Sequence, residues 1–347
     1  MGEGRVMEPS VICVGANQES LTALRGLVQR NARIVALVTL AVDAKRKRLP
    51  SDFVDMRQFC HETDIAIVET TNINSDETVD RIRKFNPDFI YTLGWSQLFK
   101  DAVLQVPTHY VVGSHPSPLP DGRGRAPVPW TILQDLRQSA VTLFRMSSDV
   151  DDGPILIQRP FEIPQRAYAS DVYQLVSESL RDAFCDLYEA HRSGRALVET
   201  AQDPRNASYR AKRGPADGHL DFSDSAARLE RLIRAVSHPY PGAYAYYRGR
   251  KITIWKADVC DVPAHVGCQG QVLAKRDQRL LVHAGDRPLW LYDFADGNEQ
   301  VPAEVFRIGA KFGFAVEDDL AALWQRIHDL EKRLSFMEGR DHRMDAA

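Results

Sequence analysis

The chain has 347 residues, enough for about two domains, and its 44% hydrophobic and 26% charged residues are ordinary for a globular protein. Its formal net charge of −3 provides no global attraction to nucleic acid, so such a ligand would need a local basic patch. Five scattered cysteines, without zinc-like spacing, indicate a reducing, cytoplasmic compartment and no bound metal. No apolar run approaches the ~18 residues of a membrane span, so no membrane contact is expected.

The first hundred residues alternate short apolar runs with amphipathic segments. Alternation of this kind predicts βαβ units and a Rossmann-like, mostly parallel sheet, that is, an α/β fold. Strands are expected at 11–15, 33–40, 66–69, 89–93 and 109–115, and helices at 19–30, 51–62 and 75–85.

A Pro-, Gly- and Arg-rich stretch at 116–127 interrupts this alternation. Beyond it the pattern resumes, and the first domain is expected to span residues 1–204. The elements expected there are a helix at 128–137, strands at 140–146 and 155–163, and a helix at 169–193.

A second, β-rich domain is expected over residues 205–315. It opens with a helix that Ser223 or Asp224 would cap. Hairpin character at 238–259 and short strands at 270–294 then predict a small barrel-like, OB-like fold.

The tail, residues 316–340, carries a narrow apolar seam with charges between its members. The seam residues follow a 3, 4, 3, 4, 3 spacing: Leu320, Leu323, Ile327, Leu330, Leu334 and Met337. Such a heptad pattern favours an amphipathic helix through which the chain forms a homo-oligomer. The alternative is a single helix that packs on its own domain.

Two segments place chemically competent side chains at one edge of the predicted sheet. A strand ends on His115, and the stiff loop after it supplies Arg123 and Arg125, whose forked guanidinium groups suit anions. About thirty residues later, the turn at 147–154 supplies three carboxylates at another strand end. Because open α/β sheets bind ligands at this edge, a His and an Asp there predict general acid–base chemistry.

These segments resemble the motifs of the folate-dependent formyltransferases, which include methionyl-tRNA, glycinamide ribonucleotide and sugar-nucleotide enzymes. HPSPLP at 115–120 and RGRAP at 123–127 are similar to the family's N-x-H-x-S-x-L-P and R-G elements. Asp151-Asp152-Gly153 is similar to its D-x-G, and residues 238–259 are similar to the start of its C-terminal β domain. The resemblance covers roughly residues 10–295 and implies formyl transfer to an amine.

The resemblance also implies roles for individual residues. His115 would move a proton and polarise the formyl group, and Asp151 would orient His115 or accept the proton of the amine. The donor would be 10-formyltetrahydrofolate. Its predicted contacts are Leu93, Gly94, Trp95, Ser117 and Asp149.

One position departs from the family pattern. The family's oxyanion-stabilising Asn aligns with Gly113, which offers no side-chain donor. Ser114, re-aimed by a bulge, a water molecule, or another side chain such as Gln97 would have to replace it. If none does, the chain is a weakly active or non-catalytic folate- or nucleotide-binding homologue.

The residues around the loop favour a nucleotide-linked amino sugar as the acceptor. RGRAP is similar to the sugar-nucleotide branch, and Asn17, Arg123, Gly124 and Arg125 are the predicted contacts of the acceptor. Lys45–Arg48, a basic run, favours the alternative of a methionyl-tRNA formyltransferase-like enzyme. The acidic net charge weighs against tRNA.

Overall fold

The computed structural model describes residues 8–42, 52–259, 265–313 and 316–344. The chain divides into two compact units. The N-terminal unit runs to Gly218 and includes Arg231–Ala243; the C-terminal unit contains His219–Glu230 and the chain from Tyr244. Residues 205–218, expected in the second domain, lie in the N-terminal unit because β9 (Tyr209–Arg210) pairs with β6 (Arg123–Gly124).

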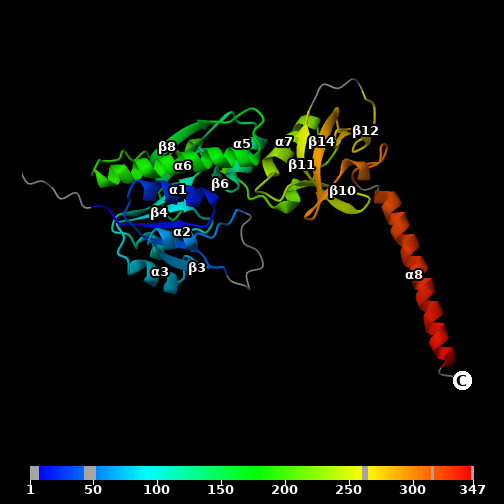
Figure 1. Cartoon of the computed structure of the whole chain (residues 1–347), viewed down its shortest axis with the longest axis horizontal. Coiled ribbons are helices and arrows are strands. Elements are labelled where there is room, and N and C mark those ends of the chain that lie inside the picture. Colours follow the sequence, from blue (N-terminus) through cyan, green and yellow to red (C-terminus); the bar gives the residue numbers. More distant parts are fainter. Residues whose placement is uncertain (1–7, 43–51, 260–264, 314–315, 345–347) are drawn as a thin grey trace, which may run out of the picture. The chain divides into compact units, whose positions relative to one another are not determined.

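Seven strands form the sheet of the N-terminal unit, in the order β3-β2-β1-β4-β5-β7-β8 (Figure 1). Their bounds are β1 (Val11–Gly15), β2 (Ile34–Leu40), β3 (Ala66–Thr70), β4 (Phe89–Gly94), β5 (Tyr110–His115), β7 (Gln138–Arg145) and β8 (Ile155–Glu162). The first five are parallel, whereas β7 and β8 are antiparallel to their neighbours. The predicted Rossmann-like, mostly parallel sheet is therefore confirmed. Strand order reverses between β1 and β4, which is where such sheets bind ligands.

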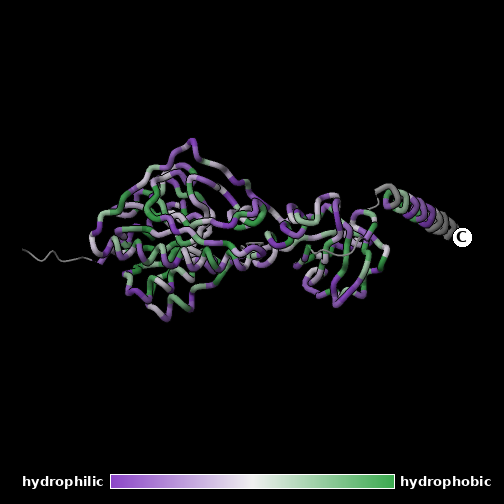
Figure 2. Tube along the Cα trace, turned by 90° about the horizontal axis from the view of Figure 1, so that it is seen from above, coloured by the Kyte–Doolittle hydropathy of each residue, from purple (hydrophilic) through white to green (hydrophobic). Residues whose placement is uncertain are grey.

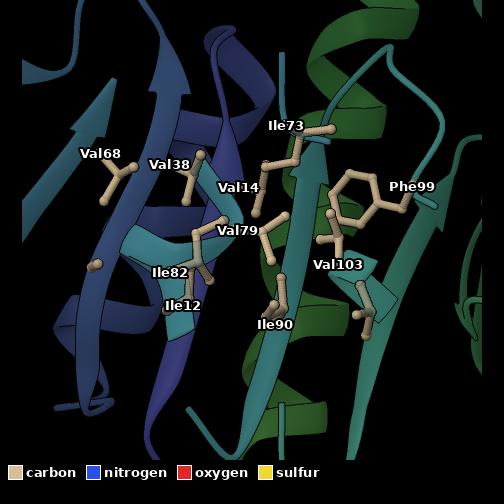
Figure 3. Packing of buried hydrophobic residues seen from close by; sticks show 12 residues of the cluster. Ile12, Val14, Val38, Val68, Ile73, Val79, Ile82, Ile90, Phe99 and Val103 are labelled. Carbon is tan, nitrogen blue, oxygen red and sulfur yellow. The ribbon is translucent and has the colours of Figure 1, made fainter. Parts of the chain in front are cut away.

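Helices cover both faces of this sheet. α1 (Gln18–Gln29) and α6 (Ala169–Arg192) pack together on one face, and α3 (Asp76–Arg83) lies on the other (Figure 1). Figure 3 shows the core under α3, where Val79 and Ile82 of the helix meet Ile12 and Val38 of the strands. Hydrophobic and hydrophilic residues alternate over short distances along the chain (Figure 2), as amphipathic elements require. The unit also contains α4 (Asp101–Leu104) and α5 (Pro127–Leu133).

One expected helix is shorter than predicted. The helix expected at 51–62 begins only at Arg57, as α2 (Arg57–Glu62). Before it, Phe53 forms a β-bridge with Asn17, and the Val54 amide donates to the Ala16 carbonyl over 3.0 Å. These contacts with the turn between β1 and α1 replace the first helical turns and bring Asp52 to the sheet edge.

The C-terminal unit contains an antiparallel sheet, which confirms its predicted β-rich character. Its strands run in the order β10 (Ala243–Tyr247), β11 (Arg250–Asp258), β14 (Pro288–Asp296), β13 (Arg279–His283) and β12 (Val272–Arg276), and β15 (Glu299–Val301) pairs with β14. The predicted caps of α7 (Ala226–Val236) are wrong. Ser225, rather than Ser223 or Asp224, accepts the Arg228 amide, and Asp286 accepts the Ala226 amide.

The tail forms one long helix, α8 (Val316–Met344). Five side chains of the seam are exposed, from 46% at Ile327 to 58% at Leu334: Leu320, Leu323, Ile327, Leu330 and Leu334. In this structure these side chains are therefore not packed against the C-terminal domain, as the alternative of an internally packed helix would require. Among the described residues, no helix is both long and apolar enough to cross a bilayer.

Candidate active site

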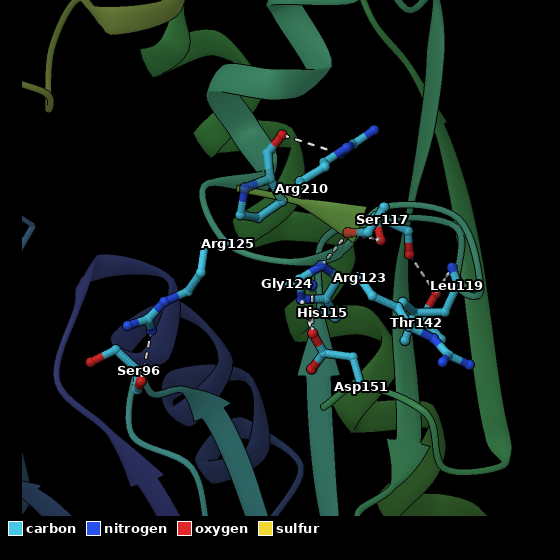
Figure 4. A network of polar contacts seen from close by, with 12 residues as sticks. Ser96, His115, Ser117, Leu119, Arg123, Gly124, Arg125, Thr142, Asp151 and Arg210 are labelled. Atoms are coloured by element: carbon cyan, nitrogen blue, oxygen red, sulfur yellow. Dashed lines mark hydrogen bonds and ion pairs between the residues drawn. The ribbon is translucent and has the colours of Figure 1, made fainter. Parts of the chain in front are cut away.

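His115 ends β5, and its imidazole lies at the carboxyl edge of the sheet with 6% exposure (Figure 4). Its Nε2 atom lies 2.8 Å from the Gly122 carbonyl oxygen. Because a carbonyl oxygen only accepts hydrogen bonds, Nε2 carries the proton of the neutral ring. Nδ1 is therefore the basic atom, and it lies 3.6 Å from Asp151 Oδ2. This orientation makes His115 a proton acceptor backed by a carboxylate.

Asp151 lies in the connection between β7 and β8, with a left-handed backbone at φ 53°. The same Oδ2 atom that faces His115 accepts the Gly124 amide over 2.9 Å. The glycine of the D-x-G motif is required sterically. A Cβ at Gly153 would lie 1.8 Å from the Arg145 carbonyl oxygen. The carboxylate is thus fixed where it stabilises an imidazolium on His115.

Gln202 holds this loop from a distant part of the chain, and the sequence analysis did not identify it. Its amide nitrogen donates to the carbonyl oxygens of Asp151 (2.9 Å) and Gly153 (2.7 Å). Its amide oxygen accepts from Arg123, at 3.1 Å from Nε and 2.8 Å from Nη2. Arg123 thereby fixes which way the Gln202 amide faces, and Gln202 positions the Asp151 backbone.

We expect Gln202→Glu to lower kcat by about 10- to 100-fold while changing KM little. Glutamate still pairs with Arg123, but it cannot donate to the carbonyls of Asp151 and Gly153. A matched control is Gln134→Glu, since Gln134 accepts from Arg210 in the same way. Steady-state kinetics beside urea unfolding separates the two roles. A loss of stability equal in both variants, with kcat unchanged in Gln202→Glu, would remove the positioning role.

A cavity of about 250 Å³ opens beside His115. Seven predicted site residues line it: Asn17, Gly94, Trp95, Ser114, His115, Gly124 and Arg125. Trp95 contributes an indole nitrogen that is buried and has no hydrogen-bond partner among the described residues. Arg125 spans the mouth and donates from Nη1 to the Ser96 carbonyl over 2.8 Å (Figure 4). The strand end and the loop thus meet at this cavity, whereas the turn at 147–154 contributes no lining residue and reaches the site through the contact of Asp151 with His115.

Other predicted contacts do not line this cavity. Leu93 is buried in the core, and the guanidinium of Arg123 is bonded to Gln202 and Tyr209. Ser117 is fully buried, and its hydroxyl donates to the Asp121 carbonyl over 2.8 Å. Asp149 lies exposed in the turn that carries Asp151. Ser117 and Arg123 shape the loop around His115 in this structure, so their direct contacts with ligands stay predictions.

The lining of the cavity also includes two carboxylates and two phenols that could not be identified from the sequence: Glu19, Asp52, Tyr173 and Tyr240. Asn17 joins the carboxylates, since its Nδ2 donates to Glu19 (3.0 Å) and Asp52 (3.3 Å). The pKa of Glu19 is raised to about 7, mainly because the carboxyl group is buried. The hydrogen bond from Asn17 lowers this pKa, and the nearby charge of Asp52 raises it. The Tyr240 hydroxyl donates to that of Tyr173 over 3.1 Å. These side chains accept hydrogen bonds, and Asp52, joined by Glu19 where the pH exceeds the raised pKa of Glu19, disfavours anions beside them.

Comparison with known proteins identifies the architecture. Residues 12–186 match the formyl transferase family, and residues 213–311 match the formyl transferase C-terminal domain. The chain belongs to the formyl transferase family. It is thus a one-carbon transferase, and the expectations of family and enzyme class are confirmed.

Individual relatives resemble this formyl transferase over most of its length. The methionyl-tRNA formyltransferase of Caldanaerobacter subterraneus subsp. tengcongensis is 23% identical over 303 residues, covering 86% of this chain and 96% of that protein. HypX of Aquifex aeolicus, crystallised with tetrahydrofolic acid, aligns at TM-score 0.61 and 18% identity. That alignment covers 86% of this chain and 46% of HypX.

A sugar-modifying relative has the same fold. The N-formyltransferase of Helicobacter canadensis, in complex with folinic acid and dTDP-3-aminofucose, aligns at TM-score 0.59 and 15% identity. The alignment covers 83% of this chain and all of that protein.

This formyl transferase fills the space beside Gly113 with hydrophobic side chains. A Cβ at Gly113 would lie 2.6 Å from the ring of Phe144 and 2.9 Å from Met146 Cγ. The proposed substitutes are already engaged. Ser114 donates to the Thr92 carbonyl over 2.7 Å, and Gln97 bonds Ile73 and Thr71. The Ser114 hydroxyl hydrogen is thus already used, and Gln97 is not among the residues that line the cavity.

We expect Gly113→Asn to destabilise the protein by about 1–3 kcal/mol, since the new side chain overpacks the buried Phe144. Urea unfolding of Gly113→Asn, Phe144→Leu and the double variant tests the clash. The double variant should be more stable than the sum of the single effects predicts. Wild-type stability of Gly113→Asn would show that the ring moves aside freely.

Proposed function

We propose that this chain transfers a formyl group from 10-formyltetrahydrofolate to the amine of a nucleotide-linked amino sugar. The observation that carries the proposal is the cavity itself, which combines a basic His115 Nδ1 backed by Asp151 with the hydrogen-bond acceptors Glu19 and Asp52 in its lining. Hydroxyl and amino groups of a sugar donate to Glu19 and Asp52, whereas an RNA backbone is repelled there. The folate and dTDP-3-aminofucose bound by the Helicobacter canadensis relative support the same choice.

The residues account for the proton movements of this reaction. The amine attacks the formyl carbon, a C–N bond forms, and His115 Nδ1 accepts the proton that the amine loses. Asp151 stabilises the resulting imidazolium. His115 then returns the proton to N10 of the folate as the bond between N10 and the formyl carbon breaks. The buried Trp95 indole N–H, which has no partner among the described residues, fits the heteroatom-rich pterin of the donor.

Two alternatives remain as proposals of lower rank. A methionyl-tRNA formyltransferase-like activity is supported by the relative that aligns over 96% of its length. The basic run that favours it, Lys45–Arg48, lies outside the described residues. A non-catalytic homologue is favoured by Gly113 and the Phe144 ring that covers it. The intact His115–Asp151–Gly124 arrangement argues against such decay.

The acceptor is tested by mass spectrometry after incubation with 10-formyltetrahydrofolate and competing amines. The panel contains uracil-, guanine- and thymine-linked amino sugars, and methionyl-tRNA is supplied separately. We expect formylation of one nucleotide sugar. Formylation of methionyl-tRNA alone would support the tRNA alternative, and binding of folate without formylation of any amine would support the non-catalytic one.

We also propose a cytoplasmic location. Cys13, Cys60, Cys185 and Cys268 are free thiols. Burial raises the pKa of Cys60 to about 11, so this thiol stays protonated near neutral pH. Free thiols of this kind are typical of reducing compartments.

Self-association through α8 remains a proposal, and the exposed seam supports it. Burying two or three leucines per helix, at ~1.5–3 kcal/mol each, holds a dimer at about micromolar concentration. We therefore expect deletion of the chain after Val316 to lower the mass seen by light scattering. Leu323→Glu with Leu330→Glu should do the same without shortening the chain. An unchanged mass in both variants would mean that another surface makes the oligomer.

A further inference from the structure

A second cavity adjoins the catalytic one within the N-terminal unit. It has a volume of about 480 Å³ and shares Asp52, Ser96, Arg125, Ala126 and Tyr240 with the first cavity. The rest of its wall comes from the segments 212–218 and 236–242, together with Pro129. A ligand with its amine at His115 therefore has room to extend past Arg125 into this second space.

The second cavity is cationic. Arg125, Lys212 and Arg213 line it, against a single lining carboxylate, Asp52. The two arginines donate to carbonyl groups, and neither forms a salt bridge within the part of the chain that the structure describes. Arg125 donates to the Ser96 carbonyl, and Arg213 donates from Nη2 to the Asp217 carbonyl over 2.8 Å.

Arg213 and Lys212 are placed differently, and both suit an anion. The Arg213 guanidinium carbon lies 5.2 Å from the centre of the Trp130 ring, a cation–π contact that helps to hold the side chain. Lys212 is exposed, and no hydrogen bond or salt bridge of its ammonium occurs among the described residues. A guanidinium that can donate two parallel hydrogen bonds, next to an exposed ammonium, is an arrangement that binds phosphate.

We propose that Lys212 and Arg213, with Arg125, form a subsite for the diphosphate of the acceptor. This inference rests on the proposed function and deepens it. Asp52 and Arg125 line both cavities, so the two cavities differ in charge by Glu19 in the catalytic one and by Lys212 and Arg213 in the second, where these cations attract phosphate. The charge distribution therefore sets the direction of the acceptor, with its sugar at His115 and its diphosphate beyond Arg125. Lys212 and Arg213 also take the place of Arg123 as the expected phosphate ligands, because the Arg123 guanidinium is bonded to Gln202.

The test measures binding of UDP and of inorganic pyrophosphate by calorimetry, and turnover separately. We expect the double variant Lys212→Ala with Arg213→Gln to bind both ligands about 10- to 100-fold more weakly, because two charge-assisted contacts are lost. With a nucleotide-linked amino sugar, KM should rise by a similar factor and kcat should stay within about threefold. A matched control is Arg83→Gln with Lys84→Ala at the exposed end of α3, which removes the same charge.

Binding and turnover separate failure of the subsite from failure of the proposed function. If wild-type protein binds UDP and pyrophosphate and the double variant does not, the subsite stands even where no amino sugar is formylated. UDP affinity equal in both proteins would overturn it. The subsite would also be overturned if the double variant lost affinity only for polyglutamylated folate. The two cations would then belong to the binding site for the carboxylates of the donor. Weakened tRNA binding with unchanged UDP binding would assign them to RNA.

Discussion

Replacing His115 with alanine is expected to lower kcat for formyl transfer by ~10²–10⁴-fold while the fold remains intact. His115 carries the one imidazole among the described residues that line the cavity, and its Nδ1 is basic because Nε2 donates to the Gly122 carbonyl. Without it, the proton of the attacking amine has no acceptor, and N10 of the folate has no donor. The measurement is tetrahydrofolate release at saturating substrates, with circular dichroism and urea unfolding on the same samples.

Chemical rescue gives this prediction its control. Imidazole added to His115→Ala enters the vacated space and should restore part of the rate, in proportion to its concentration. His115→Gln should stay inactive with imidazole, since the glutamine side chain fills the same space. A rate near that of the wild type in His115→Ala would mean that another group moves the proton.

Asp151→Asn is expected to lower kcat by ~10²–10³-fold with little change in stability. Asparagine tolerates the left-handed backbone at this position and still accepts the Gly124 amide, so the loop is preserved. What is lost is the charge that stabilises the His115 imidazolium at 3.6 Å. The variant therefore separates the electrostatic role of Asp151 from its structural one.

Asp152→Asn is the matched control, because it removes the same charge from the next position of the same turn, and Asp152 accepts from the Ser147 hydroxyl. Steady-state kinetics of both variants with one acceptor decides the point. Equal rates for Asp151→Asn and Asp152→Asn would contradict the assignment of Asp151 as the partner of His115.

The parallel sheet, the strand ending on His115 and the meeting of the two motifs could be predicted because they follow from local patterns. Short apolar runs define the strands, and parallel strands bring their carboxyl ends to one edge. Thus His115, Trp95 and Arg125 were placed correctly at one cavity. These predictions succeed because each depends only on residues close together in the sequence, within one strand and the loop that follows it.

Contacts between distant segments could not be predicted in this way. Gln202 reaches the Asp151 loop over about fifty positions of sequence, and nothing in its own surroundings marks it. Asp52 was placed in a helix because the bridge between Phe53 and Asn17 is not visible in a periodicity. From the sequence, Gly113 could be interpreted only as the loss of a hydrogen-bond donor. The structure shows that the Phe144 ring occupies the space that a side chain at this position would need. In each case a tertiary contact decided the outcome.

The most direct test of the account follows both products of one reaction. Wild-type protein, 10-formyltetrahydrofolate and the nucleotide-linked amino sugar are mixed, and released tetrahydrofolate is compared with the formylated sugar. The account predicts equal amounts of both from the wild type and almost none from His115→Ala or Asp151→Asn. Tetrahydrofolate released without a formylated acceptor, or at equal rates in all three proteins, would contradict formyl transfer by the His115–Asp151 pair.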